Sequence, residues 1–198
     1  MKDKTKLKTK DLIYAGAFAA LYMITMIIVI MVLGMFPILY FMLPLFVGIV
    51  AATVYMMYVT KVKKMGAILI LAVMFGLIMS SSGHGLAILI TVPIGILAEI
   101  IAKLGNYQSQ KMFSLSYIVF NLTMVTPYNE LYLGTAKFLD ESRVNYGDNY
   151  ADTIQNVLNT YGVWLIIFQV LIAMVGAVIG VVLAAKLFKK HFIKSGIV

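Results

Sequence analysis

The chain has 198 residues, of which 62% are apolar and only 12% are charged, and its mean hydropathy is +0.97. A soluble domain carries about 45–50% apolar and about 25% charged residues, and a globule of this size lacks the interior to bury the excess. The composition therefore excludes a soluble domain and a disordered chain, and the lack of cysteine excludes disulfides, thiol catalysis and cysteine-based metal sites. We expect an all-α integral membrane protein.

A lysine-rich head at residues 2–10 precedes an uncharged stretch from Leu12 to Tyr58, which is too long for one membrane crossing of about 20 residues. The Gly/Pro cluster at residues 34–37 predicts the break. We therefore expect membrane helices at residues 11–33 and 38–60. The first apolar run is longer than the roughly 7–15 residues of a signal-peptide core, so we interpret it as a span.

Four more helices follow along the chain. A basic turn at residues 61–64 leads into a helix at 65–79, and a Ser/Gly turn leads into a helix at 85–103. Helices at 112–134 and 161–187 flank a polar outer loop at residues 135–160. The sequence predicts one membrane domain over residues 1–198 with six transmembrane helices.

The basic residues predict the orientation. Fourteen of the 16 lysines and arginines lie in the head, the turn at 61–64, the connection at 103–111 and the tail, and only Lys137 and Arg143 lie on the other side. The positive-inside rule then places both termini in the cytoplasm. The net charge of +8 is explained by topology and lipid headgroups, and we expect no binding of nucleic acid.

The outer turn after the third helix is the first candidate site. About 15 residues reach only ~22 Å, against ~30 Å of hydrocarbon, so this turn should lie below the membrane surface. Polar backbone at that depth lines a cavity or is buried in protein. The turn holds Ser81, Ser82 and His84. Alternatively, these residues only cap the two helices.

A second polar cluster ends the fifth helix and consists of Tyr128, Asn129, Glu130 and Tyr132. A carboxylate near the end of a span is costly unless it faces a cavity, a partner or the interface. Pro127 leaves a carbonyl near Thr123 without its helical partner, which predicts an opened helix. We predict that Glu130 and His84 converge on one outward-facing pocket. The alternative is that Glu130 reaches the aqueous edge.

Two further polar residues have structural alternatives. Asn121 either contacts the substrate or forms an interhelical hydrogen bond, which is the more common role. Glu99 can pair with Lys103 four residues on, near the cytoplasmic edge, or contact a cytoplasmic partner.

Several chemistries have no visible machinery. The chain lacks GxxxxGK[ST], HExxH, GxSxG and paired intramembrane aspartates, so we expect neither ATP hydrolysis nor a catalytic residue. The 12 tyrosines and 14 methionines are typical of aromatic belts and core filling, and we predict no metal site and no cofactor. The halves show no convincing repeat, which argues against a self-contained secondary transporter.

Small residues recur at helical spacing in the first and last helices. Ala15 with Ala19 and Gly16 with Ala20 form neighbouring small-xxx-small pairs, and residues 176 and 180 are both glycine. This spacing lets another helix approach closely, either from a partner or from within the chain.

Together, the basic head, the AxxxA motif in the first helix, six spans in about 200 residues and the long outer loop resemble the S components of energy-coupling factor (ECF) transporters. The sequence looks closest to the Trep-Strep type over essentially its whole length. S components are the substrate-binding subunits of importers for vitamins and other micronutrients. The resemblance implies capture of such a small molecule from outside, in a prokaryotic plasma membrane. It also implies docking onto a transmembrane coupling subunit driven by two cytoplasmic ATPase subunits.

By position, the resemblance makes Ala15 and Ala19, with Gly16 and Ala20, the contacts to the coupling subunit. It places the substrate among the link between the first two helices, the turn at residues 80–84 and the outer end of the fifth helix. The substrate-binding set is then Ser81, Ser82, His84, Asn121, Tyr128, Asn129, Glu130 and Tyr132.

The substrate itself stays open, because the sequence lacks clear signatures for thiamine, riboflavin, biotin or folate. Uptake of haem or another tetrapyrrole by the same machinery is one alternative, since His84 and nearby Tyr and Met side chains can ligate or stack. The residues also leave open a stand-alone small transporter or channel, and an intramembrane enzyme that uses His84 with Glu130.

Overall fold

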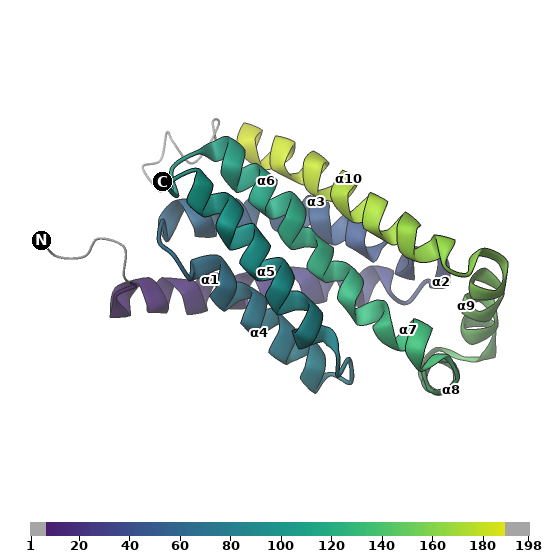
Figure 1. Cartoon of the computed structure of the whole chain (residues 1–198). Helices are drawn as coiled ribbons and strands as arrows, with labels where there is room; N and C mark the ends of the chain where they lie inside the picture. The colour runs from purple at the N-terminus through teal and green to yellow at the C-terminus, as the bar shows by residue number, and fades with distance from the viewer. Residues whose placement is uncertain (1–6, 189–198) are drawn as a thin grey trace, which may run out of the picture.

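The computed structural model describes residues 7–188, which form a helical bundle with a helical cap at one end (Figure 1). Within that range there is no strand. The elements, of which η1 is a 3-10 helix, are α1 (Thr9–Leu33), α2 (Pro37–Tyr40), α3 (Leu43–Lys61), α4 (Ala67–Ser81), α5 (Ala87–Leu104), α6 (Gln110–Phe120), η1 (Asn121–Tyr128), α7 (Asn129–Leu133), α8 (Thr135–Tyr146), α9 (Asp148–Tyr161) and α10 (Trp164–Leu187).

The expectation of an all-helical, multi-pass membrane protein is confirmed. Among residues 7–188, four helices are long and apolar enough to cross a membrane, namely α1, α3, α5 and α10. The apolar helix α4 has 15 residues and is shorter than these. The range expected for the fifth span is occupied by α6, η1 and α7, which follow one another without a loop.

The bundle has two unlike ends. The start of α1 and the end of α10 lie at one end, here the terminal end, with the α3–α4 and α5–α6 turns (Figure 1). The opposite end, here the cap end, holds α2, α7, α8 and α9. Of the lysines and arginines in the described range, only Lys137 and Arg143 lie at the cap end. The basic residues that are unevenly distributed along the sequence are therefore also concentrated at one end of the folded bundle.

Residues 135–160, expected as a loop, fold into α8 and α9. One face of α9 is apolar at helical spacing, with Tyr150, Ala151 and Ile154 buried. These side chains join a second core with α2, α7 and the start of α10. The hydroxyl of Tyr150 also donates a 2.8 Å hydrogen bond to the carbonyl of Gly34. The segment is therefore a packed cap rather than an irregular connection.

The second predicted helix, at residues 38–60, is divided after Tyr40, which corrects the sequence interpretation. Pro44 lies in the first turn of α3 and has no N–H to donate to the carbonyl of Tyr40. The hydroxyl of Tyr128 donates to that carbonyl instead. The break thus turns α2 into a separate short helix beside η1.

Close packing around α3 explains the glycine pair of α10. A Cβ atom on Gly176 would lie 2.2 Å from the carbonyl oxygen of Leu45, and one on Gly180 would lie 2.3 Å from that of Gly48. Backbone atoms on the facing helix cannot move aside cheaply, so glycine is required. This small-residue pair therefore serves packing inside the chain.

Candidate functional site

A cavity of about 240 Å³, here the outer cavity, lies between α1, α2, α4 and η1 towards the cap end. Two of the three segments that the sequence placed around the substrate contribute to it, whereas the α1–α2 link contributes no lining residue. α2 supplies Tyr40, the α4–α5 turn supplies Ser82 and His84, and η1 supplies Pro127 and Tyr128. The remaining lining side chains are Met26, Ile27, Ile30, Met31, Leu43, Met79 and Met124. The cavity is thus apolar inside, with polar groups from the turn.

His84 and Glu130 lie together at this turn. The Nδ1 atom of His84 is 3.3 Å from Oε2 of Glu130, and both side chains are 23% exposed. The preceding Gly83 has a φ of +104°, which favours glycine, and a Cβ atom there would lie 3.9 Å from the Glu130 carboxylate. The Glu130 carboxylate, near the end of the fifth predicted span, therefore contacts a side chain of the α4–α5 turn. A half-buried carboxylate requires such a partner.

The serines of the turn cap α4. The hydroxyls of Ser81 and Ser82 both donate 2.8 Å hydrogen bonds to the carbonyl of Ile78. The Ser80 hydroxyl oxygen accepts a 3.3 Å bond from the backbone N–H of Ile88. Only Ser82 of these three also lines the outer cavity. The geometry accordingly matches the capping interpretation for Ser81 and leaves Ser82 available to a ligand.

Pro127 shapes the wall that η1 contributes. Because Pro127 has no N–H, the carbonyl of Thr123 lacks its helical donor and instead accepts a 2.8 Å bond from the hydroxyl of Thr126. The chain adopts the tighter 3-10 form over Asn121–Tyr128. The opened helix expected from the sequence is present, and it turns the ring of Tyr128 towards α2.

Of the predicted residues on this segment, only Tyr128 lines the outer cavity, and Glu130 lies behind the lining residue His84. Asn129 and Tyr132 line a separate cavity of about 330 Å³ between α5, η1, α7 and α10, and the Tyr132 hydroxyl donates a 2.9 Å bond to Oε1 of Gln169. Asn121 is buried, and its amide donates to the carbonyls of Pro44 at 3.1 Å and Ala173 at 2.8 Å. Successive helical residues point about 100° apart, which divides the cluster between two faces. Asn121 makes the interhelical bond that was its structural alternative.

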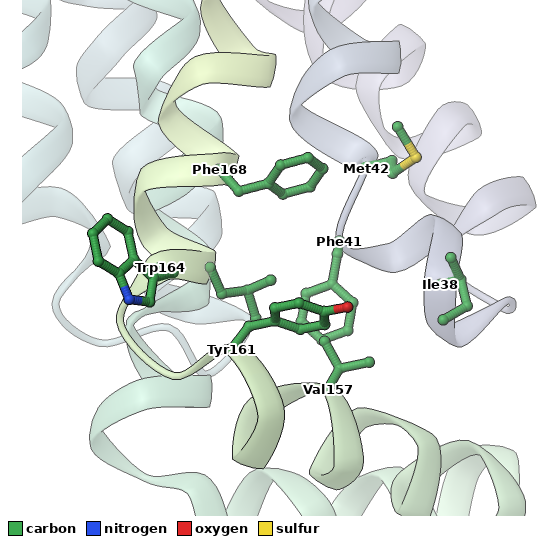
Figure 2. A pocket seen from close by; sticks show the side chains of 8 residues that line it. Ile38, Phe41, Met42, Val157, Tyr161, Trp164 and Phe168 are labelled. Atoms are coloured by element: carbon green, nitrogen blue, oxygen red, sulfur yellow. The ribbon is translucent and has the colours of Figure 1, made fainter.

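Another cavity, of about 500 Å³, was not anticipated. Figure 2 shows it between α2, α9 and α10, with Phe168 and Trp164 on α10 and Tyr161 on α9. Trp164 is 70% and Tyr161 56% exposed, and no charged side chain lines the cavity. Amphipathic rings of this kind gather at membrane interfaces. The cavity offers few polar groups to select a nutrient, so we do not assign the site to it. The spacing of the aromatic residues in the sequence was the available signal.

The structure separates the four small residues of α1. Ala15 and Ala19 are 1% and 0% exposed and pack inside the chain, so they do not form a free docking surface, which corrects the expectation. Gly16 has no heavy atom within 4 Å of a Cβ position, and Ala20 is exposed. The two pairs lie on neighbouring stripes about 100° apart, and only the second faces outward.

Glu99 has hydrogen-bond partners other than Lys103, with which the sequence predicted an ion pair. Its Oε2 accepts a 3.1 Å bond from the backbone N–H of Leu69, and its Oε1 accepts a 2.8 Å bond from the Tyr107 hydroxyl. Leu69 lies in the first turn of α4, where an anion is favourable, while Lys103 is exposed. Burial, together with this bond to Glu99, raises the pKa of Tyr107. Glu99 thus joins α4, α5 and the following turn at the terminal end, away from the outer cavity.

Comparison with known proteins identifies a family. The family described as "Hypothetical bacterial integral membrane protein (Trep_Strep)" matches residues 9–194. No curated protein and no solved structure matches the chain. The match agrees with the apolar helices in indicating a multi-pass bacterial membrane protein.

Proposed function

The chain belongs to the Trep_Strep family of bacterial integral membrane proteins, and we propose that it is the substrate-binding S component of an ECF-type importer. In this proposal it lies in the plasma membrane and captures a vitamin or other micronutrient from outside. Six segments cross the bilayer: α1, α2 with α3, α4, α5, α6 with η1 and α7, and α10. The concentration of bases at the terminal end supports a cytoplasmic location for that end.

The outer cavity is the observation that carries the proposal. It brings together three segments that are far apart in the sequence, and it combines an apolar interior with a few polar groups. Binding sites for small molecules have this composition. We assign Ser82, His84, Tyr128 and Glu130 to substrate binding. Asn121 and Tyr132 support the helices around the cavity through their hydrogen bonds.

The proposed partners follow from what the chain lacks. It carries no nucleotide-binding motif, so transport needs external ATPase subunits. We propose that the outward stripe of α1 with Gly16 and Ala20 docks onto the transmembrane coupling subunit, because small residues let a second helix approach closely. Two cytoplasmic ATPase subunits then drive the complex.

The size of the outer cavity argues against uptake of a tetrapyrrole. An apolar cavity of about 150 Å³ holds one benzene ring, and four linked pyrrole rings need several times that space. The outer cavity has about 240 Å³. A stand-alone carrier differs in a measurable way, because it would move solute in vesicles that contain this chain alone.

Native mass spectrometry of the purified protein tests the proposal. We expect a co-purified small molecule on the unmodified chain, and Glu130→Gln should lower its occupancy about tenfold or more, because a buried ligand loses a charged partner. Glu141→Gln on α8 is the matched control, since that carboxylate is 57% exposed and contacts Lys137. Equal occupancy in the unmodified chain and Glu130→Gln, or chemical conversion of the bound molecule, would contradict the proposal.

A further inference from the structure

Taking the proposed function as its basis, we infer that the outer cavity accepts a small organic cation with a flat, ring-like apolar body. Glu130 does not line the cavity itself but lies 3.3 Å from the lining residue His84, and the positive group takes the place of the His84 ring against this carboxylate. The ring lies deeper, among the methionines and tyrosines of the cavity wall. Three properties of the cavity lead to this class of substrate.

The first property is size. A volume of about 240 Å³ exceeds the about 150 Å³ that suffices for one benzene ring. It falls below the roughly 300–1,000 Å³ of pockets for drug-sized ligands. The cavity therefore fits a body of one or two fused rings.

The second property is the wall. Met26, Met79 and Met124 are buried and line the cavity from α1, α4 and η1. Thioether sulfurs make favourable contacts with the edges of aromatic rings, and the unbranched side chain adapts its shape. On another side lie Tyr40 and Tyr128, whose ring centroids are 5.0 Å apart. Sulfur on three elements and neighbouring phenol rings favour a flat aromatic body over a branched aliphatic one.

The third property is the charge at the turn. None of the lysines and arginines in the described range lines the outer cavity. At the cap end, Arg143 lies 2.8 Å from the carboxylate of Asp152, and Lys137 lies 3.7 Å from that of Glu141. Arg143 and Lys137 are thus already paired with acidic residues of the cap.

Glu130 is the acid at this position without a lysine or arginine partner among the described residues, since its charged-group contact is His84. An anionic ligand would meet this carboxylate without a fixed cation to offset it. A protonated amine exchanges the histidine contact for a charge-assisted hydrogen bond, which is the stronger type. The site therefore selects positive charge.

Three indole compounds of matched shape test the inference. Tryptamine is a cation, tryptophol is neutral and indole-3-acetate is an anion, and all share the same fused rings. Binding to the purified full-length protein is measured by calorimetric titration in detergent. We expect tryptamine to bind at least tenfold more tightly than either of the other two. Glu130→Gln should abolish this preference, whereas the control Glu141→Gln should retain it.

A second variant covers the case in which Glu130→Gln does not fold. Glu130→Asp keeps the negative charge but shortens the side chain by one methylene group, so the preference for tryptamine should fall without being lost. Equal or tighter binding of indole-3-acetate, no measurable binding of tryptamine, or an unchanged preference in folded Glu130→Gln would each overturn the inference.

Co-purification with the coupling subunit and the ATPase subunits separates the two proposals. If the complex assembles but tryptamine is not preferred, only the substrate class is wrong. If the complex does not assemble, the proposed function is wrong, whatever the three compounds do.

Discussion

Leucine substitutions on the two stripes of α1 should separate stability from docking. Ala15 and Ala19 pack inside the chain, so the larger side chains must enter filled space. Overpacking of this kind costs about 1–3 kcal/mol per site. The double variant Ala15→Leu/Ala19→Leu should therefore lose about 2–6 kcal/mol, which is a large part of the about 5–15 kcal/mol that stabilises a typical protein.

The outward pair should behave in the opposite way. A Cβ atom on Gly16 meets no heavy atom within 4 Å, and Ala20 is exposed, so Gly16→Leu/Ala20→Leu should leave the fold intact. The bulk added to this stripe keeps a docking helix at a distance. We expect affinity for the coupling subunit to fall about tenfold or more, which corresponds to about 1.4 kcal/mol.

Thermal unfolding followed by far-ultraviolet circular dichroism, together with affinity capture of the coupling subunit, distinguishes the pairs. The inner double variant should unfold at a clearly lower temperature, and the outer one near the midpoint of the unmodified chain. Equal midpoints for both would refute the assignment of Ala15 and Ala19 to the interior. Undiminished capture by the outer variant would remove Gly16 and Ala20 from the docking surface.

Three further substitutions address the core, the terminal end and the cap. Gly48→Ala places a Cβ atom 2.5 Å from the amide of Asn121, so the unfolding midpoint should fall by the equivalent of about 1–3 kcal/mol, whereas Gly85→Ala in open space should not lower it by overpacking. Glu99→Gln should destabilise the fold by about 1–3 kcal/mol yet leave tryptamine binding intact, and a change in that affinity would contradict its structural role. Tyr150→Phe removes a 2.8 Å hydrogen bond worth about 0.5–1.5 kcal/mol, so hydrogen exchange in the α1–α2 link should accelerate, and an unchanged rate would count against that tether.

The sequence predicted features that depend on local rules. Long uncharged runs located the apolar helices, and Pro127 located the opened segment, because a missing N–H affects the carbonyl four residues earlier. By the same rule Pro44 predicts the break after Tyr40, but the uncharged run around it suggested one continuous helix. The proximity of His84 and Glu130 followed from placing both at the outer side of their helices.

Features that depend on contacts between distant segments were not predictable from pattern alone. A helix that is apolar all round gives no direction for its core face, and so nothing in α1 favoured Gly16 over Ala15 as the outward residue. The prediction that Glu99 pairs with Lys103 considered only residues of the same helix. The observed partners of Glu99 come from α4 and from the turn that holds Tyr107. The cap likewise packs only because the bundle presents an apolar surface to it.

The helix pair α4–α5 makes different contacts with the rest of the protein at its two ends, and this difference bears on how the pair could move. At the terminal end, Glu99 binds the first turn of α4 and the Tyr107 hydroxyl, and the Ser116 hydroxyl donates a 2.7 Å bond to the carbonyl of Ala98. At the other end, the half-buried contact of His84 with Glu130 joins the pair to α7. A tilt of this pair would therefore pivot beside Glu99. Since α4 is about 22 Å long, a tilt of about 5° at the pivot swings the His84 turn by about 2 Å, enough to widen the mouth of the outer cavity.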